Sequence, residues 1–166
     1  MVNRVDFADI AVEQWRRERP DLDLSAMGPL ARFVRLARAG GAAVDAAFER
    51  RGLDRGEFDV LATLRRGGAP FARSPSALAG DLLVTRGGIS KRIDRLSAGG
   101  LVIRDRGDAD RRAVTVRLTS EGLELIDRLI VEHCANEVSL LAVLSEIERR
   151  QLDRTLRRLL EHVGAT

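Results

Sequence analysis

The hydrophobic residues of this 166-residue chain recur at helical spacing over most of its length. A first apolar stripe runs from Phe7 to Trp15 and is ended by Pro20. A longer stripe begins near Ser25 and stops at Gly52, a residue type that commonly follows a helix. We therefore predict two N-terminal helices, of which the second is the longer.

Three short helices are predicted next, because each apolar segment is preceded by a residue that caps helices. Side-chain oxygens at these positions accept hydrogen bonds from the free backbone N–H groups of the first helical turn. The three helices are expected to end near residues 66, 83 and 98. The capping signals are Asp54 with Glu57 in a capping box, Ser74 followed by Pro75, and Thr85 before Arg86.

The apolar period then changes from about 3.6 residues to two. The side chains of residues 102–104 and 114–118 follow this period of two, which predicts two strands. The polar segment between them predicts that the strands form a β-hairpin. Thr119 restarts a helix whose segment 123–143 is apolar on more than one face, so it requires burial on several sides. Ser145 with Glu148 opens a final helix, and the fold class is mainly α with a small hairpin.

Charge is placed unevenly along the chain, although 28 basic and 25 acidic residues leave a net charge of only +3. The segment 86–117 holds nine basic residues against four acidic ones. Such a basic segment in a mildly acidic chain indicates a polyanionic partner. Lys91 is the only lysine, so the basic residues are otherwise arginines.

The composition excludes several classes of protein. No apolar run approaches the roughly 20 residues that a membrane span needs, and acidic residues interrupt the N-terminal segment where a signal peptide would be apolar. A single cysteine, Cys134, excludes an internal disulfide and fits a reducing compartment. We therefore expect a cytoplasmic protein with no membrane partner.

The third short helix has two unlike faces. On a helical wheel Ile89, Ile93 and Leu96 fall together on a buried face, whereas Lys91 and Arg95 lie opposite, with Ser90 beside them. A basic helix of this kind behind a short helix and turn is typical of DNA recognition, and the hairpin would then reach the minor groove. The predicted DNA-binding residues are Arg86, Ser90, Lys91 and Arg95 on the helix, and Arg106, Arg111 and Arg112 on the hairpin.

The run LLVTRGGISKRIDRLSAGGLVIRDRGDADRRAVTVRLTSEG, residues 82–122, resembles the core of the MarR family of transcriptional regulators. The matching positions are Gly100-Leu101-Val102, Asp110-Arg111-Arg112 and Leu118-Thr119. The resemblance implies a winged helix-turn-helix, residues 53–118, on a dimerisation frame of N-terminal helices, 1–52, and C-terminal helices, 119–166, all in one domain. It also implies a nucleoid-associated homodimer that binds a palindromic operator in double-stranded DNA, usually as a repressor weakened by a small ligand.

A narrower resemblance concerns the ligand. The N-terminal helix with Trp15 and the segment EFDVLATLRRGGAPF are similar to the urate-responsive branch of that family, whose pocket motif corresponds here to Trp15, Asp59, Arg92 and Arg104. Arg92 lies about 60° from Ile89 on the wheel, so it points inward more than toward DNA. A guanidinium there suits a planar anion such as urate, which would repel Asp59. Lys91 departs from the asparagine common in that branch and favours guanine or a phosphate.

Other interpretations stay open at this point. Trp15 can be a residue that anchors a dimer interface, and Asp59 and Arg92 can form a purely structural ion pair. The basic face of the third short helix can simply be exposed to solvent, or it can bind an acidic protein in place of DNA. Cys134 is expected to be buried in the hydrophobic core, and the alternative is that it is the reactive thiol of a redox-sensing regulator. His133 and His162 form no metal set, and the chain carries no nucleophile elbow, Walker loop or Rossmann fingerprint. We therefore expect that the protein is not an enzyme and binds no cofactor.

Overall fold

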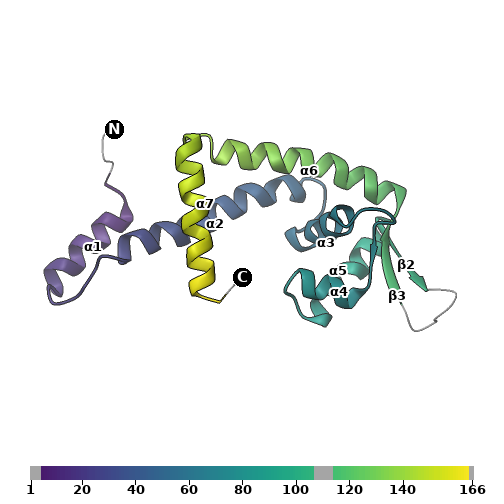
Figure 1. The fold of residues 1–166 in the computed structure, drawn as a ribbon, viewed down its shortest axis with the longest axis horizontal. Coiled ribbons are helices and arrows are strands. Elements are labelled where there is room, and N and C mark those ends of the chain that lie inside the picture. Colours follow the sequence, from purple (N-terminus) through teal and green to yellow (C-terminus); the bar gives the residue numbers. More distant parts are fainter. Residues whose placement is uncertain (1–4, 107–113, 165–166) are drawn as a thin grey trace. The chain divides into compact units, whose positions relative to one another are not determined.

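The computed structural model describes residues 5–106 and 114–164 (Figure 1). The described residues form two compact units, the first ending at Ala43 and the second beginning at Val44. The first unit holds α1, Phe7–Glu18, and the first part of α2, Met27–Glu49. Asp6 and Asp9 form a capping box at the start of α1. Arg32 of α2 bonds to both of these carboxylates, so one guanidinium ties the two helices together.

The second unit contains the remaining elements around one hydrophobic core. The bounds in chain order are α3, Arg55–Arg66; β1, Ala72–Arg73; α4, Pro75–Asp81; α5, Arg86–Ala98; β2, Val102–Arg106; β3, Val114–Leu118; α6, Ser120–Leu140; and α7, Glu146–His162. The core draws side chains from the end of α2, α3, α4, α5, two strands and α6. This mainly helical architecture with a small antiparallel sheet confirms the predicted fold class.

Each predicted capping residue begins a helix. The Asp54 and Glu57 side chains exchange hydrogen bonds with each other's backbone N–H at 2.8 Å, and Ser145 with Glu148 form the same box at α7. Ser74, Thr85 and Thr119 also accept from the first turns of their helices. Local capping chemistry therefore fixes where the helices begin.

The sheet has one strand more than the sequence predicts. Its order is β1-β3-β2, all antiparallel, with Arg73 opposite Val116 and Val102 opposite Leu118. The short β1 lies between a glycine-rich break and a helix cap, and two residues are too few to show an alternating pattern. It covers the edge of β3, so the hairpin is anchored to the helices on one side.

Close backbone packing joins α5, β2 and α6. The Thr119 hydroxyl donates to the Gly100 carbonyl at 2.7 Å, and the Thr119 N–H donates to the Leu101 carbonyl at 3.1 Å. A Cβ at Gly122 would overlap that same Leu101 carbonyl. These positions therefore hold the start of α6 to the segment that joins α5 to β2.

The apolar surface of α6 is only partly used within one chain. Ile126 and Leu129 are fully buried, whereas Val131 and Val138 are 68% and 61% exposed. The expected burial of this helix on several sides is therefore incomplete in the isolated chain. Among the described residues, no helix combines the length and the low polarity that crossing a membrane requires.

Candidate DNA-reading face and ligand cleft

Helix α5 presents the two faces that its sequence predicts. Ile89, Ile93 and Leu96 are at most 1% exposed and pack into the core. Ser90 and Lys91 are exposed, as is Arg86 in the first turn. The buried aliphatic edge thus fixes the rotation of the helix and leaves these polar side chains on the outside.

A groove of about 540 Å³ lies beside this outer face. Arg86 and Ser90 of α5 line it together with Ser74 and Ser76 from the start of α4. The hydroxyls of Ser74, the capping residue, and Ser76 of α4 lie 3.0 Å apart. Ser74 and Ser76 were not among the predicted site residues, because the sequence marks Ser74 only as a helix cap.

Arg95 has partners inside the protein. Its Nη2 bonds to Asp54 Oδ2 at 2.6 Å, and its Nε lies 2.8 Å from Glu57 Oε1. The Glu57 side chain is only 8% exposed, so Arg95 provides the positive charge that a buried carboxylate requires. The helical wheel gave the direction of Arg95 correctly as outward from the α5 core, but it carried no information on the neighbouring α3.

The hairpin is described only in part. Arg106 is the last residue of β2 and pairs with Val114 across the sheet. Arg111 and Arg112, predicted at the tip, lie outside the described residues. Their assignment to DNA stays a prediction.

Asp59 and Arg92 lie near each other in the second unit. Burial raises the pKa of the Asp59 carboxyl above its ordinary value, and the positive charges of Arg55, Arg92, His133 and Arg66 oppose that rise. Within residues 5–106 and 114–164, the Asp59 side chain has no hydrogen-bond or ion-pair partner. The charge of a partly buried carboxylate without a direct partner responds strongly to a charged group placed beside it, so such a residue is typical of a ligand-binding site.

The guanidinium of Arg92 lies over the first turn of α3. A Cβ at Gly56 would come closer than 3 Å to its Nε and Cζ atoms, so glycine leaves the space that this side chain occupies. Arg92 is itself partly buried. Its inward direction, predicted from the wheel, is confirmed.

The other two predicted ligand residues have separate surroundings. Trp15 belongs to α1 in the first unit and is 48% exposed there. Arg104 of β2 bonds to Asp94 Oδ1 of α5 at 2.6 Å. The second unit therefore associates Asp59 with Arg92, and it pairs Arg104 with a different carboxylate.

A cleft of about 340 Å³ opens next to Asp59 between α3 and α6. Its apolar walls include Phe58, Ile126 and Ile130, and His133 lines it as well. The His133 ring packs against Phe58 with a centroid distance of 5.0 Å, and its Nε2 lies 3.1 Å from Glu137 Oε1. Sequence reasoning considered His133 only as a metal ligand, although its spacing from Ile126 and Ile130 places it on the same helix face.

Cys134 is exposed, so the prediction that it is buried is wrong. It lies one position beyond His133 and faces away from the core, on the same side as the exposed Val131 and Val138. Among the described residues, no group of three or more histidine, cysteine or acidic side chains is placed to hold a metal ion.

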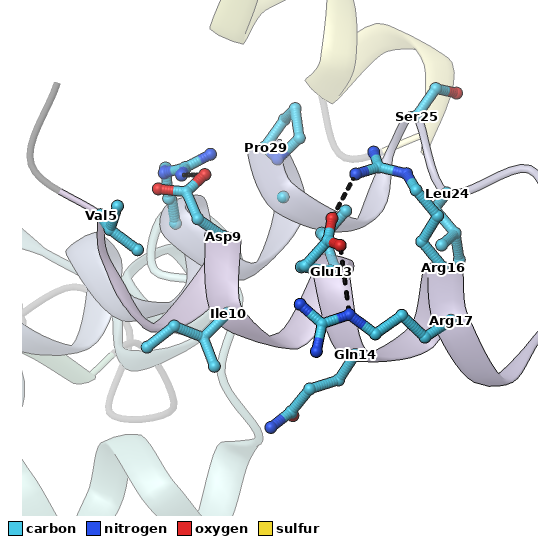
Figure 2. Close-up of a pocket in the computed structure, with 13 residues that line it drawn as sticks. Val5, Asp9, Ile10, Glu13, Gln14, Arg16, Arg17, Leu24, Ser25 and Pro29 are labelled. Atoms are coloured by element: carbon cyan, nitrogen blue, oxygen red, sulfur yellow. Dashed lines mark hydrogen bonds and ion pairs between the residues drawn. The ribbon is translucent and has the colours of Figure 1, made fainter.

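The first unit has a charged groove of about 660 Å³ between α1 and the start of α2 (Figure 2). Glu13 bonds there to Arg16 at 2.7 Å and to Arg17 at 3.3 Å, as the dashed lines in Figure 2 show. Asp9 is held by Arg32. These charges neutralise one another, so they provide no strong attraction for a charged ligand.

Comparisons with known proteins agree with this geometry. A sequence model described as "MarR family" matches residues 51–113. The chain is 40% identical over 163 residues to the HTH-type transcriptional regulator PecS of Dickeya dadantii, and 98% of each chain is covered.

Two solved structures have a similar fold. The first is Sco3205, a MarR family regulator from Streptomyces coelicolor solved in complex with DNA, with a TM-score of 0.75, 21% identity, and coverage of 85% of this chain and 89% of that one. The second is BpsR of Bordetella bronchiseptica, whose DNA binding is regulated by 6-hydroxynicotinic acid. Its TM-score is 0.66 at 26% identity, and the match covers 80% of this chain and 91% of BpsR. These relatives and this fold are those of transcriptional regulators and not of enzymes.

Proposed function

Because the chain belongs to the MarR family of DNA-binding transcriptional regulators, we propose that it is a homodimeric repressor whose operator binding a small anionic ligand weakens. The observation that carries the proposal is α5, whose aliphatic edge is buried while Arg86, Ser90 and Lys91 are exposed. A helix presented in this way enters the major groove in helix-turn-helix proteins.

The proposed DNA contacts follow from that orientation. Ser90 and Lys91 contact bases or phosphates from the exposed face of α5, and Arg86 contacts phosphate beside the groove that Ser74 and Ser76 line. Arg106, Arg111 and Arg112 contact the backbone or the minor groove from the hairpin. A lysine or arginine that neutralises a phosphate contributes affinity that falls with salt.

Exposed apolar side chains support the proposed homodimer. Phe33 and Val34 of α2 are 48% and 60% exposed, and Ile147 and Val163 of the α7 region are also exposed. Large unpaired apolar surfaces on terminal helices favour association with a partner. In a dimer with twofold symmetry the two recognition helices meet two half-sites of a palindrome.

We place the ligand at the inner side of α5, where Arg92 carries its charge near Asp59. A guanidinium binds a planar anion through paired hydrogen bonds, and BpsR provides a relative regulated by such a compound. Urate is the candidate that the sequence resemblance favours. Binding by Arg104 requires that this side chain also leave Asp94.

The proposed response is electrostatic. An anion on Arg92 repels the Asp59 carboxylate, and because Asp59 is part of α3 while Arg92 is part of α5, the repulsion acts between the two helices. The ligand shifts the equilibrium only through its different affinities for the two arrangements. The arrangement it favours spaces the recognition helices wrongly for the operator.

The test compares Asp59→Asn with the wild type in operator binding, with and without urate. Because the amide keeps the shape but not the charge, we expect unchanged affinity without urate and a much weaker response to it. Asp127→Asn, which changes an exposed carboxylate of α6, is the matched control and should respond as the wild type does. A full urate response in Asp59→Asn would contradict the mechanism.

A further inference from the structure

We infer that Arg95 is a positioning residue, which fixes the recognition helix α5 on the first turn of α3 and does not bind DNA phosphate. The inference rests on the proposal that the outer face of α5 meets DNA. It changes the role that the sequence pattern suggests for this arginine, from a direct DNA contact to a clamp within the protein.

The clamp consists of one guanidinium and two carboxylates. Arg95 Nη2 bonds to Asp54 Oδ2 at 2.6 Å, and Arg95 Nε lies 2.8 Å from Glu57 Oε1. Contact with two acidic groups at these distances offsets the charge of Arg95 and directs its Nε and Nη2 donors toward α3, while the side chain as a whole is 50% exposed. To reach a phosphate, the side chain would have to leave a nearly buried carboxylate without its cation.

Both acidic residues are held by their own helix. Asp54 Oδ1 accepts the Glu57 backbone N–H, and Glu57 Oε2 accepts the Asp54 backbone N–H, each at 2.8 Å. The capping box therefore uses one oxygen of each carboxylate and leaves the other for Arg95. The start of α3 thus offers two carboxylate oxygens, already oriented by the capping box, to the guanidinium of Arg95 in α5.

Arg92 makes a second connection between the same two helices. It lies one helical turn before Arg95 and covers Gly56, between the two capping residues. The two arginines of α5 together enclose the first turn of α3. The position of the recognition helix therefore depends on charge pairing at this turn as well as on the apolar core beneath it.

The test compares Arg95→Met with Lys91→Met, because methionine keeps an unbranched stem and removes the charge. Operator affinity is measured by anisotropy over a series of salt concentrations. For Arg95→Met we expect a loss of affinity of about tenfold or more with the wild-type salt slope, because a misplaced α5 weakens specific contacts without losing a phosphate contact. For Lys91→Met we expect a lower affinity together with a slope smaller by about one.

A double-mutant cycle with Glu57→Gln separates positioning from general destabilisation. Glutamine keeps the capping oxygen but not the charge, so the effects of Arg95→Met and Glu57→Gln on operator affinity should be strongly non-additive. The effects of Lys91→Met and Glu57→Gln should simply combine. Circular dichroism at the assay temperature establishes that each variant is folded, and thermal unfolding should show the same coupling between positions 95 and 57.

Two results would overturn the inference. One is a salt slope reduced by about one in Arg95→Met, and the other is additivity of Arg95→Met with Glu57→Gln in both affinity and thermal unfolding. If Lys91→Met changes neither affinity nor slope while the coupling of Arg95 with Glu57 is present, the proposed DNA face is wrong and the clamp stands.

Discussion

Asp59 illustrates how a single buried carboxyl can lower the stability of a fold. Its carboxyl is partly buried beside the cleft between α3 and α6, and among the described residues no donor bonds to it. Burial therefore raises its pKa, which means that the folded state favours the neutral form. Above that raised pKa the ionised carboxylate is less stable in the protein than in the unfolded chain.

We predict that Asp59→Asn raises the melting temperature at neutral pH. Because the folded state holds the Asp59 proton more tightly, wild-type stability rises as the pH falls through the raised pKa, and the advantage of the amide should shrink over the same range. Thermal unfolding of both proteins between about pH 7 and pH 4 measures this. Asp127→Asn removes a carboxylate that bonds to Arg65 at 2.6 Å and should not stabilise the protein. An equal melting temperature for Asp59→Asn and the wild type at neutral pH would refute the burial cost.

The sequence predicts the direction in which individual side chains point, but it does not predict which residues they contact. The wheel placed Ile93 in the core and Arg92 inward, because both follow from helical geometry alone. It did not show that Arg95 meets Asp54 and Glu57, since that pairing depends on how α3 packs against α5. The predicted capping box does indicate a cationic neighbour, because it uses only one oxygen of each carboxylate and leaves the other oxygen for a further donor.

At the scale of elements, α1 is joined to α2 by the bonds from Arg32 to Asp6 and Asp9. The Arg32 guanidinium is the largest cause that lowers the pKa of Asp6 to about 2, and it also lowers the pKa of Asp9. Because these carboxylates ionise more readily in the folded state, their contribution to stability is present above the ordinary pKa of 3.8. It is lost as the pH falls from there toward about 2.

We predict that Arg32→Met moves the acid unfolding of the first unit to higher pH. Without the guanidinium, the pKa of Asp6 should return toward its ordinary value, so the carboxylates take up protons earlier. Trp15 is the only tryptophan and the chain has no tyrosine, so its emission during an acid titration reports on α1. Arg16→Met is the control, because Arg16 pairs with Glu13 within α1 alone. Identical titrations of Arg32→Met and the wild type would show that this ion pair does not join the helices.

The sequence predicts every helix of the described chain because each has an apolar segment at helical spacing, and α3 to α7 also follow a capping residue that the sequence shows. It missed β1, whose pairing with β3 is a tertiary contact with no local period. It also overestimated the burial of Cys134, because an apolar neighbourhood in the sequence does not say which face of α6 meets the core. These differences all concern contacts between elements, which local patterns do not encode.

At the level of the whole molecule, the proposed function requires two copies of the chain. The exposed apolar residues of α2 and α6 are unpaired in one protomer, and a single recognition helix would read only one half-site. Symmetric association would cover these surfaces and pair the two helices. Sequence-specific binding to a palindrome is therefore the central claim, since it requires the recognition face and the dimer together.

The most direct measurement is a titration of the protein into a palindromic duplex from upstream of its own gene and into a scrambled duplex of equal length. Anisotropy at physiological salt gives both affinities. We predict binding of one dimer per palindrome and a preference over the scrambled duplex of roughly 10³ or more. Equal, weak binding to both duplexes, repeated with other candidate palindromes, would contradict it.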